Sequence, residues 1–285
     1  MASPAAAAGE AATAPVGDGE VLVWWLGQAS IYLRGSAGSV LVDPFLTPGD
    51  RRLVAPAFAP DAAPAVDAVL VTHEHSDHLD PAALAGLSRR SPAARIVAPA
   101  PIVPLVVAAG VPEERVAGVQ PGAPLTVGRV RIDTVPAVHA VSVSDGYSDG
   151  ADHPGGPVRF VGYVIDLGGV RVYHSGDTIG YPGLTDGVAA LRPDLTLLPI
   201  NGRDYFREEA NLVGNLSAEE AAGVAVRIGV DAVVPMHYEM FANNRGELGR
   251  FVELLRERSE TVTVIAPGHG RPMVYRRWRG HGSNS

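Results

Sequence analysis

Short apolar, β-branched runs alternate with amphipathic stretches along most of this chain. The first runs are separated by glycine-containing turns and predict a β-meander over residues 21–25, 30–33 and 39–42. Later runs alternate with helical patterns, which indicates an α/β fold, and two hairpins turn at Gly128 and at Gly168-Gly169. Helices are predicted at 81–90, 101–109, 217–228 and 246–258, and further strands at 69–72, 95–98, 116–119, 123–127, 130–135, 158–166, 170–174, 195–200, 231–235, 261–266 and 272–275.

The pattern predicts one composite domain over residues 21–275, because no linker or internal repeat divides it. Residues 1–20 are rich in Ala, Pro and Gly and lack a basic segment, so we expect a disordered arm and not a signal peptide. Residues 276–285 are expected to form a flexible tail. No apolar run approaches the roughly 18–20 residues of a membrane helix, so we expect a cytoplasmic protein with no membrane partner.

The stretch with the most chemistry follows the strand predicted at 69–72. It places four metal-capable side chains within six positions: His73, His75, Asp77 and His78. Imidazole and carboxylate suit Zn²⁺, Mn²⁺ or Fe²⁺. The Asp-Pro pair at 80–81 resembles the N-cap and first position of the next helix, which would hold the loop at both ends. We interpret the stretch as a metal site and not as a histidine-rich surface loop.

The order His-x-His-x-Asp-His after a short apolar strand resembles the metallo-β-lactamase superfamily. The resemblance implies a four-layer αβ/βα sandwich with a metal centre at the edge of its two sheets. It also implies a third histidine for the first ion, here His139, and a Gly-Asp carboxylate that bridges both ions, here Asp177. The nearby His174 is expected to pack beside the site.

The last ligand has two candidates. His237 follows the strand predicted at 231–235, while His269 lies in a Pro-Gly-His-Gly stretch, with which many superfamily members end. Five stretches together resemble the L-ascorbate-6-phosphate lactonase branch, in which the histidine of Pro-x-His-Tyr is the ligand. This favours His237, while His269 stays a candidate for substrate contact or for supporting a ligand. The five stretches are residues 24–30, 72–78, 173–178, 198–204 and 235–244.

Four further side chains are candidates for supporting roles. Asp43 ends a strand near the histidine loop, where it could orient a ligand histidine or simply form a turn. Arg203 could clamp an anion bidentately or belong to a structural network with Asp204. Tyr238 could help to stabilise an oxyanion. His153 lies in the polar loop 144–157, where it could touch substrate or remain solvated.

Composition narrows the possible functions. The net charge of −8 gives a nucleic-acid partner no bulk electrostatic support. All 23 basic residues are arginine, which excludes a Schiff-base lysine and a P-loop. The absence of cysteine excludes disulfides, thiolate nucleophiles and Cys-ligated zinc.

We therefore expect a metal-dependent hydrolase with two divalent ions, Zn or Mn, that uses a metal-bound hydroxide. Asp77 and Asp177 are the candidate catalytic carboxylates, since either could accept the proton of the attacking water. The expected substrate is a small anionic ester or lactone, and the resemblance implies a sugar-acid phosphate lactone and a homo-oligomer. Two alternatives remain open, a phosphodiesterase acting on a small or cyclic diester and a non-catalytic metal-binding protein.

Overall fold

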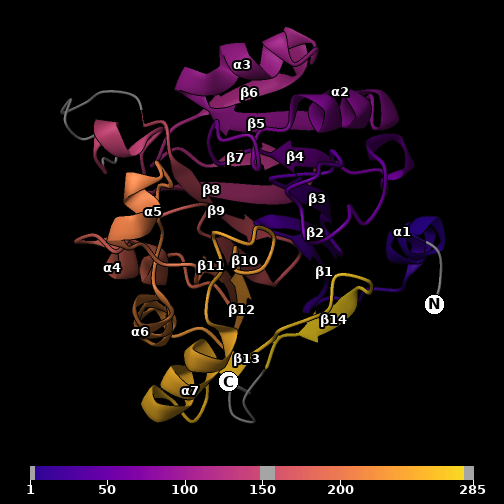
Figure 1. Cartoon of the computed structure of the whole chain (residues 1–285). Helices are drawn as coiled ribbons and strands as arrows, with labels where there is room; N and C mark the ends of the chain where they lie inside the picture. The colour runs from indigo at the N-terminus through magenta and orange to yellow at the C-terminus, as the bar shows by residue number, and fades with distance from the viewer. Residues whose placement is uncertain (1–3, 148–157, 279–285) are drawn as a thin grey trace.

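The computed structural model describes residues 4–147 and 158–278. Within these residues the strands form two seven-stranded mixed sheets that pack face to face (Figure 1). The expected α/β class and four-layer sandwich are thereby confirmed. In the first sheet the strand order is β14 (Met273–Arg276), β1 (Glu20–Gly27), β2 (Ser30–Gly35), β3 (Gly38–Val42), β4 (Ala68–Leu70), β5 (Arg95–Pro99) and β6 (Val116–Val119).

The second sheet comes from the later part of the chain. Its order is β13 (Thr263–Val264), β12 (Ala232–Met236), β11 (Leu195–Pro199), β10 (Arg171–His174), β9 (Val161–Asp166), β8 (Val130–Pro136) and β7 (Leu125–Val127). Each sheet combines a parallel part with an antiparallel part, so that β3 runs parallel to β4 and β10 parallel to β11 and β12. The carboxyl ends of these parallel strands lie at one edge of the sandwich.

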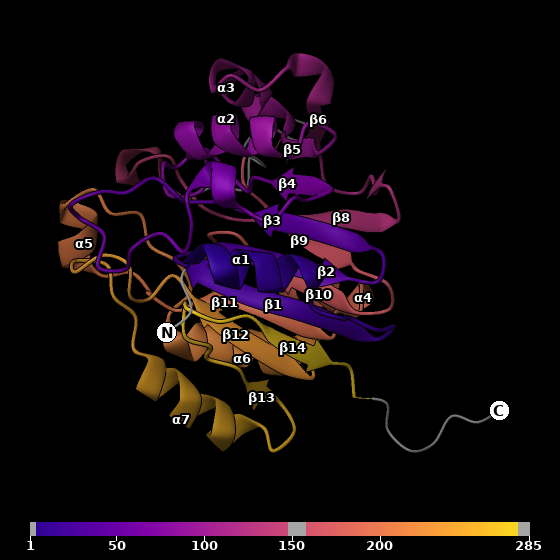
Figure 2. The same cartoon turned by 90° about the vertical axis from the view of Figure 1, so that its right-hand side faces the viewer.

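Helices cover the outer face of each sheet (Figures 1 and 2). The first sheet is covered by α1 (Pro4–Thr13), α2 (Pro81–Arg90) and α3 (Val103–Ala108), with the 3₁₀ turns Pro60–Ala62, Ala100–Ile102 and Glu113–Arg115 beside them. The second is covered by α4 (Leu184–Ala190), α6 (Ala218–Ile228) and α7 (Leu248–Arg258). Two short elements, α5 (Tyr205–Glu209) and the 3₁₀ turn Val143–Asp145, lie in loops. No described helix is both long and apolar enough to cross a bilayer.

Strand β1 is buried on both faces, which explains its nearly continuous apolar sequence. Successive side chains of a strand point to opposite faces. Trp24 accordingly packs in the layer between the first sheet and its helices, where it contacts Phe58 edge to face, and Trp25 packs between the two sheets. The paired tryptophans therefore belong to two different cores.

Capping residues determine where two helices near the site begin and end. The Asp80 carboxylate accepts the Ala83 N–H and Pro81 follows it, so α2 begins directly after the histidine loop. Ser217 and Glu220 form a capping box at the start of α6, and Gly229, with a φ of 77°, caps its end.

The prediction of a disordered arm over residues 1–20 does not hold for residues 4–13. Residues 4–13 form α1, since alanine is the best helix former, and Ala8 and Ala11 are buried against the first sheet (Figure 2). Arg34 holds the end of this helix by bonding the carbonyl oxygens of Ala11 and Ala14. At the other end of the chain β14 includes Arg276, and the Arg277 N–H donates to the Gly19 carbonyl, so the ordered chain extends beyond residue 275.

Candidate metal centre

The seven expected ligands meet at one edge of the sandwich, because each follows the end of a strand. The histidine loop follows β4 in the first sheet. In the second sheet His139 follows β8, Asp177 follows β10 and His237 follows β12. Side chains that are up to 164 positions apart in the sequence, from His73 to His237, thus share one site. Among the described residues they form two groups that are suited to hold a metal ion: His73, His75, His139 and Asp177; and Asp77, His78 and His237.

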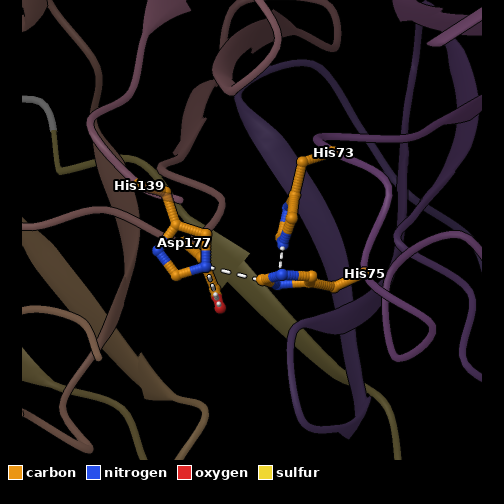
Figure 3. Close-up of side chains that lie close together, drawn as sticks. All are labelled: His73, His75, His139 and Asp177. Atoms are coloured by element: carbon orange, nitrogen blue, oxygen red, sulfur yellow. Dashed lines mark hydrogen bonds and ion pairs between the residues drawn. The ribbon is translucent and has the colours of Figure 1, made fainter. Parts of the chain in front are cut away.

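In the first group three imidazole nitrogens converge on one point (Figure 3). His73 Nε2 lies 3.0 Å from His75 Nδ1, and His139 Nε2 lies 3.3 Å from the same atom. Metal–nitrogen bonds of about 2.0–2.1 Å around a tetrahedral ion separate the ligand atoms by about 3.3 Å. The observed spacing therefore fits three nitrogen ligands around a single ion.

In the second group His78 and His237 face two carboxylates. His237 Nε2 lies 3.5 Å from Asp77 Oδ2, and His78 Nε2 lies 3.8 Å from the same oxygen. His237 has a φ of 59°, which directs its side chain from the end of β12 back towards the centre. Both imidazoles are buried. They follow strands of different sheets, so they lie close together because the two sheets pack face to face.

Asp177 lies between the two groups. Its Oδ1 is 3.5 Å from His78 Nε2, while its Oδ2 is 3.6 Å from His139 Nε2 and 3.2 Å from His237 Nε2. Gly176, with a φ of 61°, makes the sharp turn before it, since a Cβ at that position would lie 2.6 Å from the Val161 carbonyl oxygen. This placement gives one carboxylate access to two ions.

The buried ligand atoms without a hydrogen-bond partner in the described structure include His78 Nε2 and Asp177 Oδ1, which lie 3.5 Å apart. A buried polar atom without a partner costs free energy, and a cation would satisfy both of these atoms. The donor set of imidazole and carboxylate is one that Zn²⁺, Mn²⁺ and Fe²⁺ accept. The residues present therefore fit a metal centre.

The charges within the centre hold its two groups in different protonation states. Burial lowers the pKa of His73 well below 6.5 and that of His139 to about 3, so their rings are neutral and free to bind a cation. Burial also opposes charge on His78 and His237, yet the surrounding carboxylates raise the pKa of His78 well above 6.5 and that of His237 to about 9. Metal ions at the second group must therefore displace protons.

Asp43 orients His78. The Asp43 Oδ2 accepts the hydroxyl of Thr72 and lies 2.7 Å from His78 Nδ1, while Oδ1 accepts the Thr72 backbone N–H. A hydrogen bond from Nδ1 leaves Nε2 free to face the centre. His174 plays no such part, because its Nε2 donates to the Ala29 carbonyl and its Nδ1 accepts the Gly176 N–H.

His269 lies outside both groups. Its Nε2 is 2.5 Å from Glu239 Oε1, and its ring packs against Trp25 with centroids 4.4 Å apart. The structure thus brings His237 and not His269 to the other ligands. Tyr238 is buried, and its ring stacks on Trp25. It does not line the pocket described below.

Arg203 is not placed as an anion clamp. Its guanidinium forms two hydrogen bonds with Glu220, at 2.7 and 2.8 Å, and a third with the Asn215 carbonyl. Both of its terminal nitrogens are therefore engaged within the fold. His153 lies outside the described residues.

A pocket of about 280 Å³ opens onto the metal centre. Its floor includes His75, Asp77, Asp177 and His237, and its walls combine an arginine, amides and apolar side chains: Arg51, Asn211, Asn243, Asn244, Val141, Leu212, Val213 and Phe241. Arg51 and these asparagines were not among the site residues predicted from the sequence, because they lie in loops whose fold depends on contacts from distant segments. Gln28, which contacts Asp77 and His237, was also not among them.

The sequence comparisons agree with this geometry. Residues 39–238 match a family model described as Beta-lactamase superfamily domain. A UPF0173 metal-dependent hydrolase of Methanoculleus marisnigri is 34% identical over 86% of this chain and 93% of that protein. Another, of Myxococcus xanthus, is 30% identical over 94% of this chain and 88% of that protein.

Two solved structures have a similar fold. Igni18, a metallo hydrolase from Ignicoccus hospitalis, matches with a TM-score of 0.70 and 21% identity over 90% of this chain and 98% of its own. An isothiocyanate hydrolase from Delia radicum gut bacteria matches with a TM-score of 0.68 and 17% identity over 90% and 99%. The fold, the clustered ligands and the sequence relatives lead to one conclusion: the chain belongs to the metallo-β-lactamase superfamily, as a metal-dependent hydrolase of the UPF0173 family.

Proposed function

We propose that this protein hydrolyses a small anionic ester or lactone at a centre of two divalent ions, Zn or Mn. The observation that carries the proposal is the pocket, which joins residues of both metal groups to a cationic side chain, Arg51. Its volume of about 280 Å³ suits a small molecule and not a polymer. The resemblance to the L-ascorbate-6-phosphate lactonase branch supports a sugar-acid phosphate lactone.

Metal ions bound at the centre would supply an activated water and a Lewis acid. His73, His75 and His139 would hold one ion, Asp77, His78 and His237 the other, with Asp177 shared. Within residues 4–147 and 158–278, the side chains of the second group form hydrogen bonds or ion pairs with one another and with Asp177. Their other side-chain partners are Gln28, Asp43 and Thr72. The ligands are therefore also the groups closest to the reacting atoms.

Asp77 and Asp177 are the candidate proton acceptors. Both line the pocket, and the charges of His78 and His237 outweigh burial and lower the pKa of each carboxyl. Both are therefore ionised at neutral pH, as an acceptor must be. Asp77 is the more accessible of the two, with 18% of its side chain exposed against 4% for Asp177.

The pocket walls favour a polar, anionic substrate. Arg51 is exposed at the wall and forms no ion pair with a described residue, so its guanidinium is available for a phosphate or carboxylate. The Asn244 Oδ1 accepts from Asn201, and the Asn211 Oδ1 accepts the Val143 N–H, which leaves the amide NH₂ groups to donate to sugar hydroxyls.

The test is a paired assay on one preparation, loaded with Mn²⁺ or Zn²⁺ and measured with and without a chelator. Hydrolysis of a phosphorylated sugar lactone that stops on chelation is the expected result. Cleavage of a chromogenic phosphate diester without any lactone turnover would replace the proposal with a phosphodiesterase. Full metal loading with neither reaction would favour the non-catalytic reading.

A further inference from the structure

We propose that Gln28 is the positioning residue of the second metal group, where it links Asp77 to His237. The Gln28 Nε2 lies 2.7 Å from Asp77 Oδ2 and 2.8 Å from His237 Nε2. Gln28 comes from the turn between β1 and β2, and its side chain is 1% exposed. The inference rests on the proposed two-ion centre.

The amide is oriented by its neighbours. An ionised carboxylate only accepts hydrogen bonds, so the group that faces Asp77 is the NH₂ and not the oxygen. One of its hydrogens serves Asp77, and the same nitrogen lies 2.8 Å from His237 Nε2. A cation bound at His237 Nε2 would leave the hydrogen bond from Gln28 to Asp77 in place.

A second link to His237 runs through the backbone. The Gln28 carbonyl accepts the His237 N–H at 3.1 Å and the Trp25 indole N–H at 2.9 Å. It is independent of the His237 imidazole, so a ligand bound there does not disturb it. Gln28 therefore reaches Asp77 by its side chain and His237 by its main chain.

The backbone at this point is strained. Gln28 has a φ of 54° and His237 one of 59°, both in the left-handed region that costs a residue with a Cβ about 1 kcal/mol or more. The pairing of β1 with β2 also shifts register between Trp25 and Gly27, which turns Gln28 towards the centre. Strain of this kind persists only where surrounding contacts hold it, and here these contacts lead to two metal ligands.

Gln28 connects parts of the site that no strand connects. Asp77 follows β4 in the first sheet and His237 follows β12 in the second, so their separation depends on how the sheets pack. The first group differs, since His73, His75 and His139 contact one another directly and make no hydrogen bond to Gln28 in the described structure. Loss of the Gln28 amide should therefore weaken the binding of the second ion and leave the binding of the first ion unchanged.

The test compares Gln28→Met with Gln120→Met. Methionine keeps the length and volume of glutamine but removes the amide, and Gln120 is the only other glutamine of the chain. The Gln120 side chain bonds the backbone of Val158, away from both metal groups. Metal-free protein is titrated with Co²⁺ and Mn²⁺, and ions per chain are measured by elemental analysis together with the cobalt absorption spectrum.

Gln28→Met should keep the first ion and bind the second about 10–100-fold more weakly, while Gln120→Met binds two ions like the parent. A second variant, Gln28→Asn, covers the case in which Gln28→Met does not fold. Asparagine tolerates the left-handed backbone but is one methylene too short to reach Asp77, so it should also weaken the binding of the second ion.

Unchanged affinity for the second ion in folded Gln28 variants would overturn the inference, even with a lower melting temperature, because Gln28 would then support only the turn. Equal loss of both ions would overturn its selectivity for the second group. A parent protein that binds no ion would overturn the proposed function and this inference together, so the two failures are distinguishable.

Discussion

The Asp43 carboxylate lies 2.7 Å from His78 Nδ1 and also holds both the backbone and the hydroxyl of Thr72. All three groups are buried, so solvent does not compete for these bonds. The same carboxylate therefore fixes both the end of β4 and the ring of a candidate metal ligand. Partners of this kind commonly tune metal affinity as strongly as some ligands do.

We expect Asp43→Asn to lower affinity for the second ion and activity by about 10–100-fold. Asparagine tolerates the φ of 45° at this position, but its neutral amide stabilises the His78 Nδ1–H less well. The measurement is metal titration followed by a rate assay at saturating metal. The control is Asp67→Asn, which changes a carboxylate that bonds Ser39 at the opposite end of β4. Equal losses in both variants would contradict the assigned role of Asp43.

The second prediction separates the two candidate ligands near the C-terminus. His237→Ala should lose one ion per chain, because His237 Nε2 faces Asp77 and Asp177. His269→Ala should keep both ions and lose only stability, because that ring packs on Trp25 and pairs with Glu239. Elemental analysis of both variants decides the point. Retention of two ions by His237→Ala and loss of one by His269→Ala would reverse the assignment.

The third prediction concerns the substrate. Arg51→Gln should raise KM for an anionic lactone by about tenfold and change kcat little, since it removes a charge-assisted hydrogen bond at an exposed wall of the pocket. KM for a neutral lactone should stay unchanged. Arg203→Gln is the matched control, because Arg203 pairs with Glu220. A larger KM effect from Arg203→Gln would instead place the anion site at Arg203.

The fourth prediction is a pH dependence. The pKa of His237 in the metal-free protein is raised from 6.5 to about 9, since the Asp177 and Asp77 carboxylates outweigh burial. A protonated imidazole cannot bind a cation, so binding of the second ion releases a proton below pH 9. The pKa of His78 in the same group is also raised, so the apparent affinity should rise by at least about tenfold per pH unit from pH 7 to 9, as titrations with Mn²⁺ would measure.

The same shift has a consequence for stability in the metal-free protein. A folded-state pKa above the unfolded value means that the charged His237 stabilises the fold fully below pH 6.5 and that this contribution is lost as the pH rises through 9. The melting temperature of chelator-treated protein should fall over this window. An affinity for the second ion that did not vary between pH 7 and 9 would contradict the assignment of a protonated His237.

The positions of the ligands could be predicted from the sequence because local signals mark them. An apolar strand, a polar loop and an Asp-Pro cap bracket His73 to His78, and β12 leads directly into His237. The four-layer architecture followed from the strand and helix pattern and the resemblance together. The capping box of α6 was also predictable, since its two partners are three residues apart.

The partners of the ligands could not be predicted in the same way, because they come from distant segments. The Arg203 guanidinium is chemically suited to bind an anion, but it pairs with Glu220 on α6, and only the fold brings the two together. Gln28 lies 209 positions from His237. The helix α1 was missed because its stability depends on burial of Ala8 and Ala11 against a sheet that the local sequence does not reveal.

The most direct test of the account is the number of metal ions per chain, measured by elemental analysis after loading with Mn²⁺ or Zn²⁺ and removal of free metal. We predict two ions per chain, and one in the His237→Ala variant. Because His78 Nε2 and Asp177 Oδ1 lie buried at the centre without a hydrogen-bond partner in the described structure, the metal-free protein should also melt at a lower temperature. A fully folded protein that retains no metal after loading would contradict the central claim.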